Sequence, residues 1–164
     1  MDTLSHGLWG GGLFGYRGRM GLALFFGVFP DLFSFGLWLP FYYRTYGFHW
    51  GPPPMERIPE WLLAVYPVSH SLVVAGVAVA AVSFWRKEVA FAMLGWVFHI
   101  LLDAPFHTAD YFPTPIFWPV SDWMLDGIAW SNPWVWFSNV AGLVVLFLWR
   151  GRAKLTAWWL RLRR

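Results

Sequence analysis

Three side chains that could bind a metal ion stand in the otherwise apolar stretch 95–107 of the sequence. His99 and Asp103 are four residues apart, so on a helix they project from the same face. An imidazole and a carboxylate among Phe, Ile and Leu are costly to bury unless something pairs with them, and a metal ion would satisfy both. Pro105 disfavours helical geometry in the residue before it. We therefore expect the helix to end or bend there, and His107 to approach the same site from the following turn.

The composition indicates that this helix lies in a membrane. Of the 164 residues, 58% are hydrophobic and only 13% are charged. The mean hydropathy is +0.47, a value that a small soluble domain would not easily carry. Several apolar windows approach the roughly 20 residues that a bilayer core requires, and the 14 Trp residues suit membrane interfaces. We expect one all-α polytopic membrane bundle without disulfides or cysteine-ligated zinc, because cysteine is absent.

Basic residues at the turns predict the topology. We expect helices over 3–16, 20–43 with a bend near Pro40, 61–85, 89–104 and 134–149, and a structured loop or short helices over 107–133. Arg17 and Arg19, Arg86 and Lys87, and the segment 150–164 lie at alternate turns. The positive-inside rule then places them in the cytoplasm, with the N-terminus outside and the C-terminus inside. About five membrane-embedded helices result: residues 1–149 form the bundle, and residues 150–164 form a basic amphipathic cytoplasmic tail that would bind anionic lipid headgroups.

The same topology brings five polar side chains to one depth. At a rise of about 1.5 Å per residue, each of them lies roughly 17–24 Å from its nearest basic turn; they are His6, Asp31, His70, His99 and Asp103. Four different helices carry them, and incidental polar residues would not be expected to converge in this way. We therefore predict that they meet in the outer half of the bilayer of the cytoplasmic membrane, facing the extracytoplasmic side, and that with His107 they form a set of metal ligands.

The types of these side chains indicate the chemistry. Histidine and carboxylate ligands suit zinc and other borderline divalent ions, bound either singly or as two ions that share a carboxylate. Water at such an ion becomes a nucleophile near neutral pH, while the ion polarises a phosphoryl or acyl oxygen. We therefore expect a hydrolase whose catalytic centre includes Asp103, with Asp122 as a candidate general acid or base. Ser69 and Ser71 are candidates for orienting the ligands.

An ordered set of short motifs resembles a known family. Asp2 to Gly10 (DTLSHGLWG), Pro30-Asp31, Ser69-His70-Ser71, His99-x-x-x-Asp103, Phe112 to Pro115 (FPTP) and Trp118 to Asp122 (WPVSD) occur in the order found in the YdjM-like family of inner-membrane proteins, which are described as metal-dependent hydrolases. The order of the ligands also resembles that of zinc-dependent phospholipase C. This resemblance implies His6, Asp31, His70, His99 and Asp103 as ligands. Phe33 and Ser34 stand where many relatives carry a second acid and a histidine.

Two other functions fit the same residues. A non-catalytic membrane protein could use the polar or metal cluster only to hold its helices together. An ion or proton carrier could bind its cargo there. However, residues 72–81, directly after the motif around His70, are all Leu, Val, Ala or Gly, and the lack of polar side chains disfavours a permeation path. The predicted partners are membrane lipids and a phosphoester substrate, phospholipase C-like or phosphatase-like in its chemistry, and no nucleic acid is expected.

Overall fold

The computed structural model describes residues 1–48 and 52–162, with side chains described as far as Arg152. Over these residues the chain is helical and contains no β-strand, which confirms the all-α prediction. The helices are α1 (Thr3–Phe14), α2 (Met20–Phe35), α3 (Trp38–Tyr46), the short 3-10 helix η1 (Met55–Arg57), α4 (Glu60–Ser69), α5 (Leu72–Ser83), α6 (Lys87–Phe106) and α7 (Pro133–Leu162).

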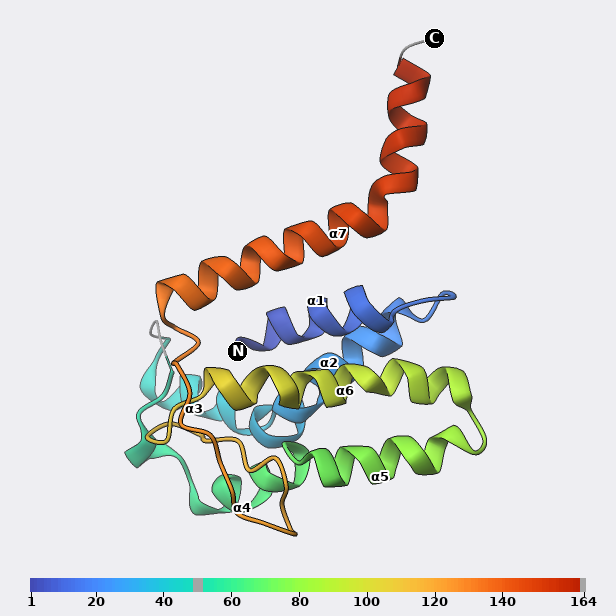
Figure 1. Ribbon diagram of the computed structural model, residues 1–164. Coiled ribbons are helices and arrows are strands. Elements are labelled where there is room, and N and C mark those ends of the chain that lie inside the picture. The colour runs from blue at the N-terminus through green and yellow to red at the C-terminus, as the bar shows by residue number, and fades with distance from the viewer. Residues whose placement is uncertain (49–51, 163–164) are drawn as a thin grey trace.

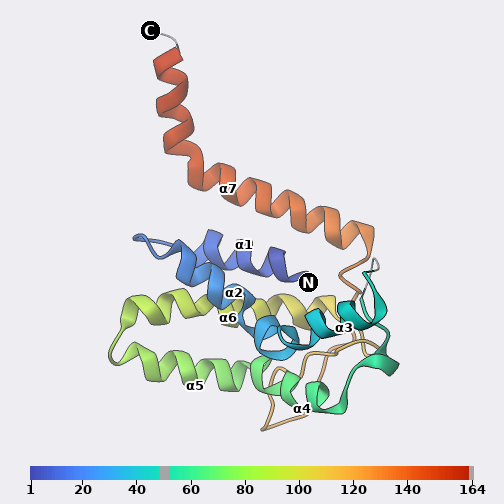
Figure 2. The same ribbon diagram turned by 180° about the vertical axis from the view of Figure 1, so that it is seen from behind.

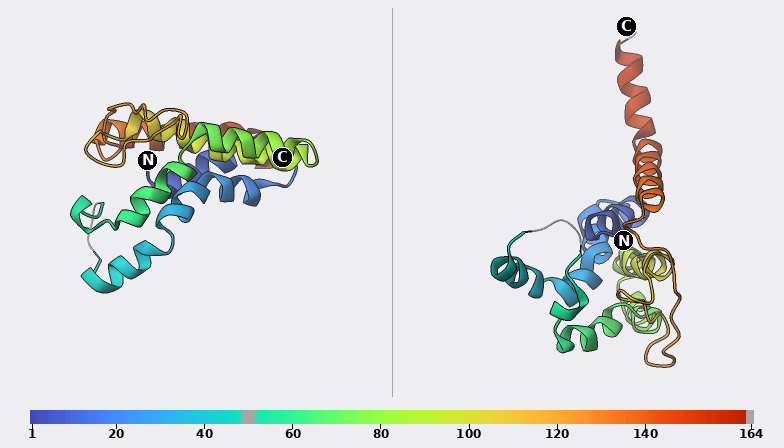
Figure 3. Two further views of the ribbon diagram at one scale, coloured as in Figure 1. Left: turned by 90° about the horizontal axis from the view of Figure 1, so that it is seen from below. Right: turned by 90° about the vertical axis from the view of Figure 1, so that its left-hand side faces the viewer.

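The longer helices lie side by side. Figures 1 and 2 show α1, α5, α6 and the first half of α7 running along one direction, with α7 on one side of α1 and α5 on the far side of α6. α1 and α2 both pack against α6, and α7 contacts α1. α3, α4 and the loop between α6 and α7 gather at the end where α1 begins (Figure 3). The bundle therefore has one end made of loops and short helices and one end made of tight turns.

Two helical segments are long and apolar enough to cross a membrane, Lys87–Phe106 and Pro133–Arg152. The pairs α2 with α3 and α4 with α5, bent by 56° and 49°, raise the number to four if each pair forms one span. α1 has 12 residues. Its length of about 18 Å is short of a hydrocarbon core of about 30 Å. The fold is thus compatible with membrane insertion through two to four spans, and the expected count of five stays a prediction.

The breaks between helices differ in place from those expected. α2 continues through Pro30, and the chain bends between Phe35 and Trp38 rather than near Pro40. The segment 61–85, expected as one helix, is interrupted after Ser69. There Ser71 adopts extended geometry, and its side chain accepts hydrogen bonds from the first backbone N–H groups of α5. A serine cap of this kind stabilises a new helix start, so it competes with continuation of α4.

Glycines let α1, α2 and α6 approach closely. A Cβ atom at Gly27 of α2 would lie 2.5 Å from the carbonyl oxygen of His6 on α1, and one at Gly10 of α1 would lie 2.6 Å from the carbonyl oxygen of Ala23. A Cβ atom at Gly95 of α6 would lie 2.9 Å from the same Ala23 oxygen. These contacts leave no space for a side chain, so the three helices meet backbone to backbone.

Basic side chains gather at the end of the bundle with the tight turns. Arg19 donates a hydrogen bond of 3.0 Å from Nε to Glu88 in the first turn of α6, and Arg17 lies 4.0 Å from the same carboxylate. Arg150 of α7 donates to backbone carbonyl oxygens at the end of α1, and its guanidinium lies 4.3 Å from the centre of the Tyr16 ring. The α1–α2 turn, the α5–α6 turn and this part of α7 therefore share one end (Figure 1).

Candidate metal centre

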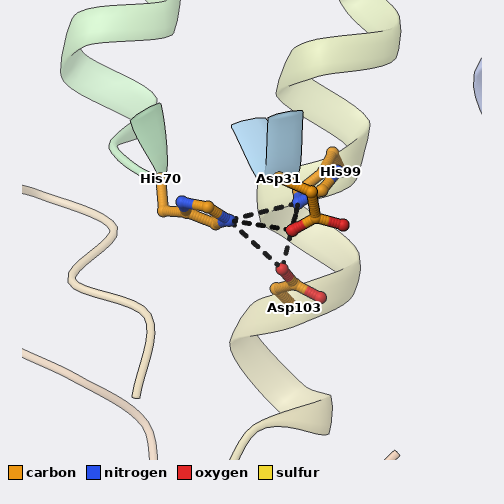
Figure 4. Close-up of side chains that lie close together, drawn as sticks. All are labelled: Asp31, His70, His99 and Asp103. Carbon is orange, nitrogen blue, oxygen red and sulfur yellow. Dashed lines mark hydrogen bonds and ion pairs between the residues drawn. The ribbon is translucent and has the colours of Figure 1, made fainter. Parts of the chain in front are cut away.

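Four buried or nearly buried side chains converge near the other end of the bundle. Asp31 comes from α2, His70 from the break between α4 and α5, and His99 and Asp103 from α6 (Figure 4). One nitrogen or oxygen atom of each lies within 4.8 Å of those of the other three, so the group could hold a metal ion. We refer to these four residues as the Asp/His cluster. Its members come from distant parts of the sequence, and their meeting confirms the expected convergence for these four residues.

The distances within the Asp/His cluster suit a single ion. Nε2 of His99 lies 3.1 Å from Oδ2 of Asp103, 3.3 Å from Nε2 of His70 and 3.6 Å from Oδ1 of Asp31. Nε2 of His70 lies 3.7 Å from an oxygen of each carboxylate. Two ligand atoms about 2.0–2.1 Å from a tetrahedral zinc ion are about 3.3 Å apart. The observed separations lie close to that value.

Both histidines of the Asp/His cluster face it with Nε2 and are held in place by hydrogen bonds of Nδ1. Nδ1 of His99 lies 2.7 Å from the carbonyl oxygen of Gly27, and Nδ1 of His70 lies 3.1 Å from that of Tyr66 and 2.9 Å from Oγ of Ser69. A carbonyl oxygen can only accept a hydrogen bond, so each Nδ1 carries the proton that it donates. In the neutral rings each Nε2 then presents a lone pair to the cluster. Metal-binding histidines are held in this way in proteins.

His6 approaches the centre from α1. Its Nε2 lies 2.9 Å from Oδ1 of Asp103, and its ring stacks on that of His99 with 3.6 Å between the ring centres. Nδ1 of His6 is buried and has no hydrogen-bond partner among the described residues. His6 therefore reaches the predicted place but stands outside the four residues that form the compact group.

α6 passes through Pro105 and ends at Phe106, two residues later than expected, and His107 follows it directly in extended geometry. Its Nε2 lies 3.4 Å from Oδ1 of Asp103, and its Nδ1 donates a hydrogen bond of 2.7 Å to the carbonyl oxygen of Phe112. Burial lowers the pKa of His107, which favours the neutral ring. Like His6, it contacts the cluster through Asp103 and is not one of the four compact residues.

The two carboxylate oxygens of Asp103 face different pairs of histidine nitrogens. Oδ2 lies near His70 and His99, whereas Oδ1 lies near His6 and His107. The Met1 amino group also contacts Oδ1, at 2.5 Å. A carboxylate placed between two sets of nitrogen donors has the arrangement needed to bridge two ions.

The Asp/His cluster opens to the surface at Asp31. The Asp31 side chain is 13% exposed, against 0–1% for the other three. It lines a pocket of about 310 Å³ together with His107 and aromatic side chains that include Trp38 and Trp130. Thr3, which also lines the pocket, donates a hydrogen bond of 2.5 Å to Oδ2 of Asp31. A small molecule would therefore reach the cluster through this pocket.

The other residues predicted for the site differ in their distance from the Asp/His cluster. Asp122 is exposed and lines a different hollow, with Pro67 and Trp118; among the described residues, none of the Asp/His cluster lines it. Its role as an acid or base stays a prediction. Ser69 does contact a ligand, since its hydroxyl lies 2.9 Å from Nδ1 of His70. Ser71 instead caps α5 and donates a hydrogen bond to the carbonyl oxygen of Trp118.

The sequence analysis missed three residues that hold the ligands. The Tyr66 ring stacks on His70 with 3.8 Å between centres. Trp96 donates a hydrogen bond of 2.6 Å to the carbonyl oxygen of Ser69, at the break where α4 ends. Gly27 provides the acceptor for the ligand on α6. Tyr66 precedes His70 by four residues, a spacing that could have indicated the stacking, whereas Trp96 and Gly27 come from other helices and gave no such signal.

No family model, no curated protein and no solved structure matches the chain. The resemblance to the YdjM-like family thus rests on the ordered motifs alone, and the function has to be argued from the geometry of the Asp/His cluster.

Proposed function

We propose that this protein is a metal-dependent hydrolase of the cytoplasmic membrane, similar to the YdjM-like proteins, that cleaves a phosphoester of a lipid or of another envelope molecule. The Asp/His cluster carries the proposal. When both rings are neutral, its Nε2 atoms and carboxylate oxygens present lone pairs to one another at 3.1–3.7 Å. Such groups repel unless a cation lies between them. In a purely structural cluster, a protonated ring would instead donate to a carboxylate, so the metal content of the purified protein separates the two cases.

We assign zinc to the Asp/His cluster, because two imidazoles and two carboxylates are typical ligands of this ion. Oδ1 of Asp103 with His6 and His107 would form a second, weaker position beside the first. Zinc bound in the cluster would lower the pKa of a water molecule enough to make it a nucleophile near neutral pH, and would polarise a phosphoryl oxygen.

The chain's own residues orient the ligands and admit the substrate. The carbonyl oxygens of Gly27 and Tyr66 fix the two imidazoles, and the Thr3 hydroxyl fixes Asp31 at the mouth of the cluster. The pocket at Asp31 has mainly aromatic and proline walls and two carboxylates, Asp2 and Asp31, and no Lys or Arg lines it in the part of the chain that the structure describes. A phosphoester bound there would therefore owe its electrostatic attraction to the metal centre.

We further propose that the N-terminus lies outside the cell, the C-terminus inside, and the metal centre on the extracytoplasmic side. The basic turns support this orientation, because Arg17, Arg19, Lys87 and Arg150 gather at one end of the bundle. Lys87 and His99 are 12 residues apart on α6. They are therefore separated by about 18 Å along the helix axis. The expected binding of anionic headgroups by the tail concerns mainly residues after Arg152, whose side chains lie outside the described part of the chain.

The test is product release by purified, zinc-replete protein. The panel would contain phospholipids and isoprenoid phosphates, with carboxylic esters and amides as further substrates. Asp103→Asn keeps the shape of the side chain but removes a ligand charge, so we expect turnover to fall about 100-fold, and chelation to abolish it. Activity that survives in both controls would come from another protein. A fully metallated protein that is inert across the panel would overturn the proposal and favour a structural cluster.

A further inference from the structure

A second hollow lies between α1 and α7, on the side of α1 that faces away from the Asp/His cluster. Its volume is about 470 Å³. Its walls are apolar and regularly spaced: Leu4 and Leu8 on α1, and Trp136, Val140, Val144 and Phe147 on α7. Residues four apart lie on one face of a helix, so each helix presents one continuous apolar face to the hollow. We call this hollow the α1–α7 groove.

The α1–α7 groove is held open by polar contacts between its two helices. Trp9 of α1 donates a hydrogen bond of 2.7 Å to Oδ1 of Asn139 on α7, and the Asn139 amide donates one of 2.8 Å to Oγ of Ser5. Arg150 holds the same two helices together at the far end. Because these contacts fix the distance between the helices, the groove exists before anything binds in it.

Hydrocarbon can reach the α1–α7 groove from the side. Leu4, Trp136 and Val144 are 71%, 41% and 52% exposed. α7 is also one of the two helices that are long and apolar enough to cross a membrane. The groove extends along residues 136–147 of α7. This stretch is about 16 Å long at 1.5 Å per residue, more than half the thickness of one leaflet plus its headgroups.

The α1–α7 groove meets the pocket of the metal centre at the first turn of α1. Asp2 lines both hollows. Its carboxylate is fixed as the helix cap by hydrogen bonds of 2.9 and 2.7 Å from the backbone N–H and the hydroxyl of Ser5. The next residue, Thr3, lines the pocket and donates to Asp31 of the cluster. The polar end of the groove is thus one residue from a direct contact to a metal ligand.

We infer that the α1–α7 groove holds the hydrocarbon chain of a lipid substrate while its phosphoester headgroup occupies the pocket at Asp31. This inference rests on the proposed function and narrows it. The substrate is a phosphoester amphiphile with a long hydrocarbon chain, and a water-soluble phosphoester lacks the part of the molecule that the groove binds. The chain lies in the membrane beside α1, and the headgroup bends around Asp2 to reach the cluster.

Two neighbouring valines provide a matched test. Val144 lines the groove, whereas Val145, the next residue of α7, is 65% exposed and does not line it. Val144→Trp would fill the groove, and Val145→Trp adds the same ring to the lipid-facing surface. Both variants would be assayed on a long-chain phospholipid from the panel and on its short-chain, water-soluble analogue. Leu8→Phe, on the opposite wall, replaces Val144→Trp if that variant does not fold.

We expect Val144→Trp to raise KM for the long-chain lipid about tenfold, because the ring would take the place of the hydrocarbon chain. Even one extra or missing methylene in an apolar pocket changes discrimination between substrates by about tenfold or more. KM for the short-chain analogue, and kcat for both, should stay at wild-type values. Val145→Trp should change neither constant. An equal effect of both variants, or KM values independent of chain length, would overturn the inference while leaving the proposed hydrolase intact.

A binding measurement separates the groove from the chemistry. A phospholipid with a photoreactive diazirine at the end of its chain would be added to the protein in phosphatidylethanolamine and phosphatidylglycerol vesicles, and labelled peptides mapped by mass spectrometry. We expect labelling concentrated on residues 136–147, lost in Val144→Trp and kept in Val145→Trp. Labelling spread evenly over the exposed helices would mean that only bulk lipid covers the groove, and would overturn the inference. Concentrated labelling of a protein that hydrolyses nothing in the panel would retain the lipid site and overturn the proposed function.

Discussion

His99 is oriented by a glycine on another helix: its Nδ1 donates a hydrogen bond of 2.7 Å to the carbonyl oxygen of Gly27. The same glycine is a point of closest approach between α2 and α1, since a Cβ atom there would lie 2.5 Å from the carbonyl oxygen of His6. One position therefore controls both the orientation of a ligand on α6 and the distance to the helix that carries His6.

Gly27→Ala should weaken metal binding although it removes no ligand. The added methyl group would push α1 from α2 and displace the carbonyl that holds His99, so we expect a loss of roughly 10–100-fold in zinc affinity. A competition titration with a chromophoric chelator measures it. Gly21→Ala on the same helix is the control, because a Cβ atom there meets nothing within 4 Å. Equal affinities of the two variants would contradict the role given to Gly27.

His99→Ala should abolish the tightly bound ion. The substitution removes the Nε2 atom that lies within 3.1–3.6 Å of the three other donors of the Asp/His cluster. Elemental analysis of detergent-purified protein should give about one tightly held equivalent of zinc for the wild type and none for the variant. The same stoichiometry in both proteins, or no metal in either, would end the metalloprotein interpretation.

His107→Ala should distinguish one ion from two. His107 contacts only Oδ1 of Asp103 among the carboxylate oxygens of the centre, so its loss should spare the ion in the Asp/His cluster. At high free zinc we expect about two equivalents for the wild type and about one for the variant. Loss of all zinc from His107→Ala would instead make His107 a ligand of the first ion.

Cysteine labelling should reveal the orientation in the membrane, because the chain has no cysteine of its own. Asp110→Cys places a thiol on an exposed turn at the end of the metal centre, and Phe84→Cys places one on the exposed α5–α6 turn. An impermeant thiol reagent added to intact cells should modify the first and spare the second. The reverse pattern would put the metal centre on the cytoplasmic side.

Arg150→Met should lower the thermal stability of the bundle. The guanidinium donates to the carbonyl oxygens of Gly11, Gly12 and Gly15 at 3.3, 2.5 and 2.9 Å, which satisfies the end of α1. Hydrogen bonds from charged donors contribute about 1.5–3 kcal/mol, so a fall of several degrees in Tm is expected. Arg86→Met removes an exposed arginine from the α5–α6 turn at the same end of the bundle and serves as the control. Equal Tm values for both variants would show that the carbonyl contacts do not matter.

The sequence was informative about the site because depth can be counted along a helix. Each polar residue could be placed by its distance from a basic turn, and Asp31, His70, His99 and Asp103 do meet. Counting gives the level of a residue but not its direction around the helix axis. His6 lies at the expected height along the bundle, yet its Nε2 faces Oδ1 of Asp103 rather than the four atoms of the compact group.

The break at His70 could not be predicted from apolar periodicity. Residues 61–66 and 72–82 are apolar, so apart from Pro67 and the polar triplet Ser69-His70-Ser71 the segment is typical of a single span. What separates α4 from α5 is local hydrogen bonding: Ser71 caps the second helix, and Trp96 of α6 satisfies the carbonyl group of Ser69. The second of these contacts depends on a residue from another helix, so tertiary structure decided the outcome.

All four donors of the Asp/His cluster precede α7, which begins at Pro133. A ribosome therefore completes these four residues before it synthesises the last helix, and under the proposed function metal binding would not have to wait for that helix. α7 adds one wall of the α1–α7 groove, and among the side chains that the structure describes it contributes none to the Asp/His cluster. Under the two proposals, the part of the chain made first would suffice for the ion, whereas the groove for the lipid chain would be complete only once α7 is made.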